Sequence, residues 1–176
     1  PLAAIDENIA QNTIITNAPS KTFNLAGLST SYVIISNQKL KNRYYNLLFD
    51  MHLNGGNIFG NIALETAYNK GHDWLAKMTD YVEKNISLVK QFVNKHSDRM
   101  ELTEPEATYL LWLNFNKLRM SDPELREFII KKVDLGLNPG TQFGPGGEGF
   151  QRMNVACPRS VVIEALEKLE KAFEQL

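Results

Sequence analysis

The sequence has a single cysteine, Cys157, among its 176 residues. One thiol excludes an intramolecular disulfide and is typical of a reducing compartment, so we expect a cytoplasmic protein. The sequence also has no apolar run near the length of about 18 residues that a membrane span needs, and no signal segment. Its 20 acidic and 19 basic side chains nearly cancel. This balance provides no global field for nucleic acid or an anionic membrane, and we expect neither as a partner.

Ligand patterns for a metal ion are missing as well. The three histidines stand at spacings that form no ligand pair, and neither CxxC nor HExxH occurs, so we expect no metal. Residues 144–149 match the dinucleotide fingerprint G-x-G-x-x-G, but an alternating strand pattern follows them where that motif needs a helix. We interpret this segment as a loop between strands.

Short apolar runs among helical patterns predict an α/β fold. We expect a short helix at 2–10, then buried strands at 13–16 and 32–35 that belong to a mainly parallel sheet. Ser36 is the expected cap of the helix that follows the second strand. Helical spacing continues from residue 58 to 95 with an interruption at Gly71. The predicted parts are a remnant of a large domain (1–58), a long connecting helix (59–97) and a small α+β domain (98–176).

The small domain has its own predicted elements. Residues 109–113 and 150–155 indicate strands, and residues 121–124 form a capping box that opens a helix. Ser160 is the expected cap of a last helix with an apolar stripe. These elements predict a separate sheet with helical cover.

The stretch from Asn8 to Phe49 has no acidic residue, yet it contains Lys21, Lys39, Lys41 and Arg43. Neighbouring cations and apolar flanks would favour the neutral amine of Lys21, which is the form that acts as a nucleophile. The same charges would suit a phosphate. The plainer alternative is that Lys21 is an ordinary solvated lysine at the end of a strand.

Arg152 alternates with Phe150 and Asn154 on one face of its predicted strand, because successive strand side chains point to opposite faces. It could clamp a small carboxylate through the two parallel N–H groups of its planar fork. It could equally pair with a surface acid, which is the interpretation that the chemistry alone favours.

Several segments resemble one known family. Residues 18–28, Ala-Pro-Ser-Lys-Thr-Phe-Asn-Leu-Ala-Gly-Leu, are similar to the Schiff-base lysine segment of class I/II pyridoxal-phosphate enzymes with the aspartate aminotransferase fold. The resemblance continues at 57–60, 106–110, 143–154 and 156–159, and so covers essentially the whole chain. It is strongest to the branch of cystathionine and cysteine carbon–sulfur β-lyases.

This resemblance implies a C-terminal remnant of a fold type I large domain followed by the small α+β domain. It implies that Lys21 holds pyridoxal 5′-phosphate through a Schiff base, with Ser20 also at the cofactor, and that Arg152 and Asn24 bind the substrate. The implied reaction is β-elimination from cystathionine or a cysteine-type amino acid, which yields pyruvate, ammonia and a thiol. An aminotransferase of the same fold is the alternative. A homodimer is the implied assembly.

Two departures from the family pattern bear on these expectations. Many aminotransferases have an arginine for the cofactor phosphate eight residues after the lysine, and Ser29 stands there in this chain, which favours the lyase branch. The family also has an N-terminal portion that this sequence lacks, and the sequence begins at Pro1 without methionine. We therefore expect the C-terminal part of an enzyme. A non-catalytic fragment that self-associates through its exposed former interface is the remaining alternative.

Overall fold

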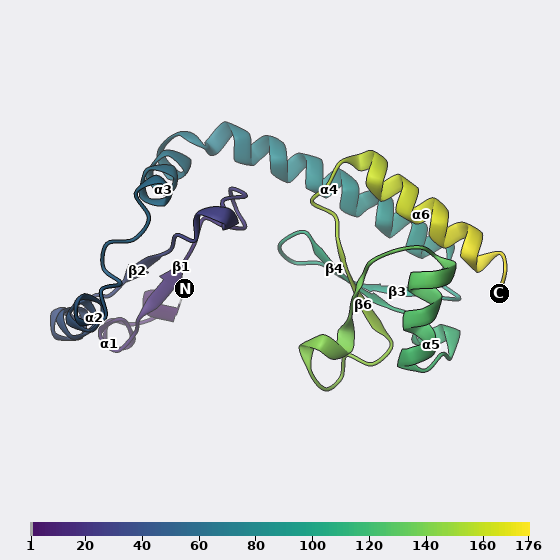
Figure 1. Ribbon diagram of the computed structural model, residues 1–176, viewed down its shortest axis with the longest axis horizontal. Helices are drawn as coiled ribbons and strands as arrows, with labels where there is room; N and C mark the ends of the chain where they lie inside the picture. The colour runs from purple at the N-terminus through teal and green to yellow at the C-terminus, as the bar shows by residue number, and fades with distance from the viewer. Residues whose placement is uncertain (1) are drawn as a thin grey trace. The chain divides into compact units, whose positions relative to one another are not determined.

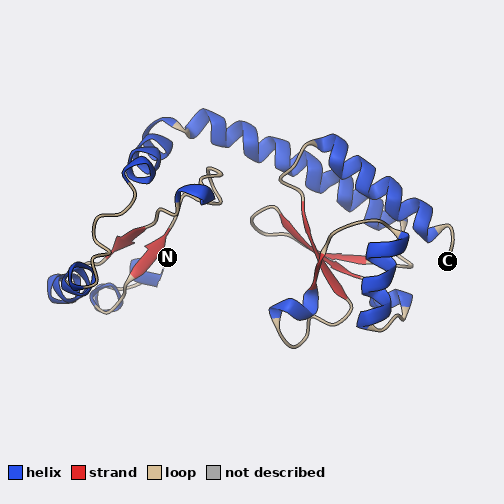
Figure 2. Ribbon diagram, in the orientation of Figure 1, coloured by secondary structure: helices blue, strands red, loops and turns tan. Residues whose placement is uncertain are grey.

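The computed structural model describes residues 2–176. The chain folds as two compact units, which meet in sequence at Lys77 and Met78 and are described separately below. Both units contain helices and strands (Figure 2), as the predicted α/β class requires. Within residues 2–176, no helix combines the length and the apolar character that crossing a membrane demands.

The first unit contains two short strands and several helices. Its elements are η1 (Leu2–Ala4), α1 (Glu7–Gln11), β1 (Ile15–Asn17), η2 (Ala26–Leu28), β2 (Tyr32–Ile34), α2 (Gln38–Asp50), α3 (Ile58–Lys70) and the start of α4 (His72–Lys95). The strands pair antiparallel, with Ile15 opposite Ile34. The expected parallel sheet is therefore wrong for residues 2–77, because an unbroken apolar run indicates burial and not strand direction.

Asparagine side chains begin both longer helices of this unit. Asn37, rather than the expected Ser36, caps α2 by accepting a hydrogen bond from the Lys39 amide at 2.9 Å. Asn57 caps α3 in the same way and accepts from the Phe59 amide at 3.0 Å. The predicted interruption at Gly71 is confirmed, since α3 ends there and α4 begins at the next residue.

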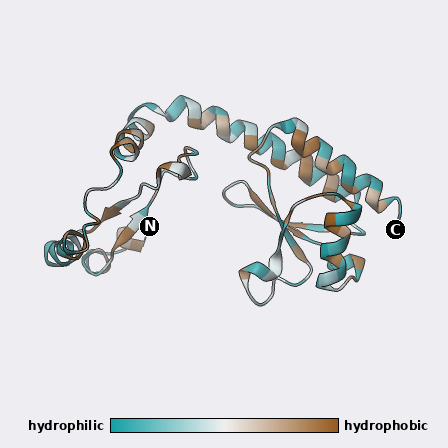
Figure 3. Ribbon diagram, in the orientation of Figure 1, coloured by the Kyte–Doolittle hydropathy of each residue, from teal (hydrophilic) through white to brown (hydrophobic). Residues whose placement is uncertain are grey.

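The first unit buries few of its large apolar side chains. Of the hydrophobic side chains between residues 2 and 77, only that of Ala10 is buried. Apolar residues recur along α2 and α3 (Figure 3), where many side chains are exposed. The exposed large side chains of these two helices are Tyr45, Leu47, Phe49, Ile58, Phe59, Ile62 and Tyr68. This surface is available to a further layer of protein.

The second unit is a four-stranded antiparallel sheet with helices on one face (Figure 1). Its elements are the rest of α4, β3 (Glu101–Thr103), β4 (Leu110–Asn114), η3 (Asn116–Leu118), α5 (Asp122–Glu127), the π-helical turn η4 (Phe128–Lys132), β5 (Asn138–Pro139), η5 (Gly140–Phe143), β6 (Phe150–Asn154) and α6 (Arg159–Phe173). The strand order is β3-β4-β6-β5. Leu111, Leu113 and Met153 point to the helical face and join Val89 and Leu169 in the core.

Local signals in this unit match the structure well. Glu124 accepts hydrogen bonds from the amide and the hydroxyl of Ser121, at 2.8 and 2.6 Å, so the predicted capping box is confirmed. Helix α6 begins after Pro158 and not at the expected Ser160. Strand β5 was not predicted, because two residues that include a proline carry no strand pattern.

Candidate functional site

Lys21 lies in a tight turn between β1 and η2. The turn is closed by two backbone hydrogen bonds, from Phe23 to the Pro19 carbonyl at 2.8 Å and from Leu25 to the Ser20 carbonyl at 3.1 Å. Pro19 is buried, whereas Lys21 is exposed. The Lys21 side chain forms no hydrogen bond or ion pair with the described residues, so its amine has no carboxylate partner there. The apolar enclosure expected from the sequence is not provided by residues 2–77.

Phe23 anchors this turn to the helices that follow. Its ring packs edge-on against Tyr68, with centroids 5.4 Å apart, and lies 6.3 Å from the ring of Trp74. Gly71 leaves the space for this ring, since a Cβ there would stand 2.8 Å from Phe23 Cε1. Phe23, Leu25 and Trp74 line an apolar groove along α3. The segment that carries Lys21 is thereby held at a defined place on the first unit.

The residues after the turn are held on α3 as well. Asn57 Nδ2 and Thr30 Oγ1 both donate to the Leu28 carbonyl, at 3.1 and 3.0 Å. Gly60 is buried beneath Thr30, and a Cβ at position 60 would lie 1.7 Å from Thr30 Oγ1. These contacts bring η2 so close to α3 that only glycine fits at position 60 without movement.

The two other residues predicted in this segment lie near Lys21 in sequence. Asn24 is exposed and has a φ of 55°, a left-handed conformation that asparagine tolerates better than most residues. Ser20 is half-buried, and its hydroxyl has no hydrogen bond to the described residues. Both side chains are therefore free to contact a ligand.

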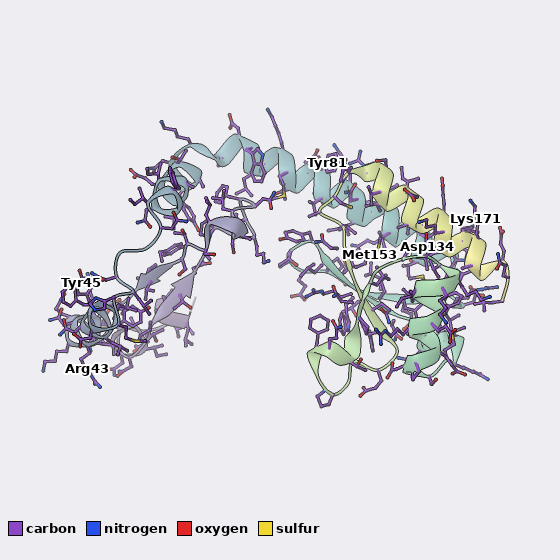
Figure 4. The ribbon with its side chains drawn as sticks, in the orientation of Figure 1. Arg43, Tyr45, Tyr81, Asp134, Met153 and Lys171 are labelled. Atoms are coloured by element: carbon purple, nitrogen blue, oxygen red, sulfur yellow. The ribbon has the colours of Figure 1, made fainter. Side chains whose placement is uncertain are left out.

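The structure does not gather the four cations of the acid-free stretch. Lys39, Lys41 and Arg43 lie on α2, at the far end of the β1–β2 pair from the Lys21 turn (Figures 1 and 4). Lys21 stands apart from the other three, and any anion beside it would meet hydroxyl and backbone groups of its own turn.

Arg152 occupies the centre of the open face of the second unit's sheet. Its neighbours in register are Trp112 on β4 and Asn138 on β5. Its Nη2 donates to Asn138 Oδ1 at 3.1 Å, and its Cζ lies 4.5 Å from the centroid of the Phe143 ring. Its Nε is buried and has no hydrogen-bond partner. Because Arg152 forms no ion pair with a carboxylate in residues 2–176, the surface-pair interpretation is wrong.

Aromatic rings surround this guanidinium. The Phe143 ring meets Trp112 edge-on, with centroids 5.5 Å apart, and Trp112 stacks on Phe150 at 5.4 Å. Sequence reasoning missed Trp112 and Asn138, which lie 40 and 14 residues before Arg152. Strand register alone brings them together, and a single sequence carries no signal for it.

Close backbone contacts explain the glycines of the loop beside Arg152. A Cβ on Gly140 would lie 2.2 Å from the Gly147 carbonyl oxygen, and a Cβ on Gly147 would lie 2.2 Å from the Gly140 carbonyl oxygen. Gly149 has a φ of 75°. Strand β6 follows the loop directly. The interpretation as a connecting loop and not a nucleotide motif is therefore confirmed.

A polar junction holds α4 to the chain between β6 and α6. Asn85 is fully buried, and its Nδ2 donates to the carbonyls of Val155 and Cys157, at 2.9 and 3.1 Å. Arg159 Nε donates to Asn85 Oδ1 at 3.1 Å, and its guanidinium lies over the ring of Tyr81. Figure 4 shows Tyr81 on α4, near the start of α6. Burial raises the pKa of the Cys157 thiol at this junction.

No group of three or more histidine, cysteine, aspartate or glutamate side chains in residues 2–176 is placed to hold a metal ion. Among the described residues, the first unit presents the Lys21 amine and the second unit the Arg152 guanidinium, and neither pairs with a carboxylate of residues 2–176. These are the groups that an enzyme acting on amino acids through a carbonyl cofactor requires.

The chain belongs to the class I and II aminotransferase family, whose model matches residues 2–169. The family resemblance inferred from the sequence is therefore confirmed. Among curated proteins, the chain is 37% identical over 173 residues to the cystathionine beta-lyase PatB of Bacillus subtilis. It is 29% identical over 170 residues to the aspartate aminotransferase of Pyrococcus horikoshii.

Solved structures agree with these relatives. Cystalysin from Treponema denticola, whose crystal structure contains pyridoxal 5′-phosphate, is 36% identical and superposes with a TM-score of 0.90 over 97% of this chain. The matched region is 43% of cystalysin, 45% of the Bacillus subtilis protein and 42% of the Pyrococcus horikoshii protein. The chain therefore spans less than half the length of these relatives.

Proposed function

We propose that this chain supplies the lysine and carboxylate-binding segments of a pyridoxal-phosphate-dependent carbon–sulfur β-lyase that acts on cystathionine or cysteine-type amino acids. The observation that carries the proposal is the Lys21 turn. The Lys21 amine has no partner among residues 2–176, and Phe23 and Gly71 hold the turn in place on α3 and α4. A solvated surface lysine needs no such anchoring.

The donor groups suit the cofactor. Pyridoxal phosphate, when bound, supplies an aldehyde carbon that an amine can bond and a ring that spreads negative charge from the substrate Cα. Lys21 would bond this carbon, and the free hydroxyl of Ser20 would donate to the cofactor. No carboxylate of the described residues pairs with Lys21, so its amine is not engaged by an acid there.

Each remaining residue has a separate task. Arg152 binds the α-carboxylate of the substrate, because its guanidinium is free of acids and stands on a rigid strand. Asn24 contacts the substrate from the Lys21 turn.

The Lys21 amine also acts in the reaction. Once released, it takes the proton from the substrate Cα, and the bond from Cβ to sulfur breaks so that the sulfur leaves as a thiolate. Addition of water to the remaining three-carbon unit gives pyruvate and ammonia.

Two observations favour the lyase over the aminotransferase. Ser29 stands eight residues after Lys21, where many aminotransferases have an arginine, and the Bacillus subtilis relative is a cystathionine beta-lyase. The Pyrococcus horikoshii relative supports the aminotransferase alternative. In that reaction no bond to sulfur would break, the amino group would pass to a second substrate, and the product would be a keto acid.

We also propose a homodimer and a cytoplasmic location. The exposed apolar side chains of α2 and α3 support a covered surface on the first unit. In an isolated chain, the same surface would drive the self-association expected of a non-catalytic fragment. Size-exclusion chromatography over a range of concentrations distinguishes a defined dimer from open-ended association.

Reductive labelling of the chain tests the lysine assignment. The chain is incubated with pyridoxal phosphate, reduced with borohydride and mapped by peptide mass spectrometry. We expect the pyridoxyl adduct on the Lys21 peptide, in preference to Lys39, which is exposed on the same unit and serves as an internal control. Label spread evenly over Lys21 and Lys39 would contradict a cofactor site at Lys21.

Product analysis tests the reaction. Because the chain spans less than half of its relatives, the assay uses a fusion in which the N-terminal portion of the Bacillus subtilis relative precedes this chain. Pyruvate, ammonia and a thiol released from cystathionine would support the lyase. A keto acid formed together with amino transfer to a second substrate would support the aminotransferase instead.

A further inference from the structure

The guanidinium of Arg152 is held from two directions. The Phe143 ring covers one of its flat faces, with Cζ 4.5 Å from the ring centroid. This contact limits tilting of the guanidinium but still lets it turn within its own plane. Asn138 Oδ1 accepts from Nη2 at 3.1 Å and fixes that in-plane orientation. Together the two contacts fix the orientation of the Arg152 guanidinium.

The three nitrogen atoms of Arg152 are not equivalent in this arrangement. Nε is buried without a partner, and Nη2 already donates one hydrogen to Asn138. Nη1 has no hydrogen bond to residues 2–176 and, unlike Nε, is not enclosed. A carboxylate takes two parallel N–H groups from one edge of a guanidinium. Because Nε is enclosed, the edge that joins Nη1 and Nη2 is the one that can receive a carboxylate.

The sheet holds Asn138 at a fixed position beside the Arg152 guanidinium. It pairs in register with Arg152 on β6, and Pro139 pairs with Gln151. The close approach of Gly140 to Gly147 then brings the β5–η5 segment against the loop before β6. An asparagine also offers a neutral acceptor. Unlike an acid, it orients the guanidinium without neutralising the charge that a substrate carboxylate needs.

We propose that Asn138 is a positioning residue, which orients Arg152 so that the Nη1/Nη2 edge receives the α-carboxylate of the amino-acid substrate. The inference rests on the proposed function, since it takes Arg152 as the carboxylate site. It adds that the neutral amide at position 138 determines affinity for the carboxylate, and that an acid of the same shape cannot replace it.

The test compares Asn138→Ala, Asn138→Asp and Arg152→Ala with an Asn154→Ala control. Asn154 lies on the same strand face as Arg152, and within residues 2–176 its side chain bonds the Ala156 amide and not Arg152. In the isolated chain, the Arg152 Nε–H signal is followed by ¹H–¹⁵N NMR while L-alanine, an α-carboxylate without a second anionic group, is added. In the fusion with the Bacillus subtilis portion, KM and kcat are measured with cystathionine.

We expect Asn138→Ala to weaken L-alanine binding and raise KM by roughly fivefold to tenfold with little change in kcat, as loss of ground-state binding predicts. Faster rotation about the Arg152 Nε–Cζ bond should exchange Nη1 with Nη2 and average their N–H signals. Asn138→Asp should be worse than Asn138→Ala, because its carboxylate pairs with Arg152 and repels the substrate. Asn154→Ala should match the wild type.

Two other results would each overturn a different claim. If Asn138→Ala binds L-alanine as the wild type does while Arg152→Ala abolishes binding, position 138 does not orient Arg152, and the positioning role is wrong although the proposed function stands. If Arg152→Ala leaves binding and KM unchanged, the carboxylate site itself is misassigned and both proposals fail.

Discussion

Gly71 and the ring of Phe23 occupy adjoining space in the first unit. A Cβ at position 71 would stand 2.8 Å from Phe23 Cε1 and 2.4 Å from the Ala67 carbonyl oxygen. Gly71 therefore does more than end α3. It lets Phe23 pack toward Tyr68 and Trp74, and through Phe23 it determines where the turn with Lys21 sits.

Gly71→Ala should destabilise the first unit by about 1–3 kcal/mol, the usual effect of an extra methyl group in a packed site. It should also reduce pyridoxyl labelling of Lys21, because the displaced ring moves the turn. Denaturant unfolding followed by Trp74 fluorescence, in a Trp112→Phe background, measures the first effect. Gly27→Ala is the control, since nothing lies within 4 Å of a Cβ there. Equal stability of the two variants would contradict this role of Gly71.

Asn85→Ala should cost the second unit about 2–3 kcal/mol in free energy of unfolding. The change leaves the buried carbonyls of Val155 and Cys157 without their donor and removes the acceptor of Arg159 Nε. Unfolding followed by Trp112 fluorescence, in a Trp74→Phe background, measures the loss.

Asn94→Ala is the matched control for that experiment. Asn94 is on the same helix, is exposed and has no side-chain hydrogen bond to residues 2–176. We expect a change within about 0.5 kcal/mol of the wild type. A similar loss in both variants would indicate that helix propensity, and not the buried junction, explains the effect of Asn85→Ala.

The local parts of the fold could be predicted from the sequence. The capping box at Ser121, the break at Gly71 and the strands around residues 111 and 152 each depend on a few neighbouring residues, so short-range patterns suffice. The direction of the β1–β2 pair could not be predicted. It depends on which strands meet, and an apolar run such as residues 32–35 looks alike in either arrangement.

The candidate site, too, could be predicted where short-range patterns suffice and not where strand pairing decides. Lys21 was found from a resemblance and an unusual charge distribution, and Arg152 from strand alternation. The surroundings of Arg152 were not found, because Trp112 and Asn138 reach it through cross-strand register. The acid-free stretch led to one wrong expectation. Cations close in sequence were expected to act together, but Arg43 lies on α2, at the far end of the β1–β2 pair from the turn between β1 and η2 (Figure 1).

Phe143→Leu should weaken L-alanine binding to the chain by roughly threefold to fivefold. Leucine keeps an apolar side chain at the site but lacks the π face over which the Arg152 guanidinium lies, a contact worth about 0.5–1 kcal/mol at an exposed position. The NMR titration of the Arg152 Nε–H signal measures the effect. Phe143→Tyr, which keeps the ring, should bind like the wild type. Equal weakening in both variants would attribute the effect to packing against Trp112.

The stabilisation that Glu170 gives the second unit should be lost in acid. Hydrogen bonds from Lys95 at 2.9 Å and from His96 at 2.6 Å hold the pKa of this carboxyl below its ordinary value. A carboxyl with a lowered pKa in the folded state stabilises that state above its ordinary pKa, and the stabilisation is lost as pH falls through the lowered value. The free energy of unfolding, measured at pH 7 and pH 4, should therefore fall less in Glu170→Gln than in the wild type.

Glu174→Gln is the control. Glu174 is an exposed neighbour on the same segment without an ion pair in residues 2–176, so this variant should lose as much stability as the wild type does. If Glu170→Gln instead loses as much stability between these pH values as the wild type, the contacts with Lys95 and His96 do not contribute to folding.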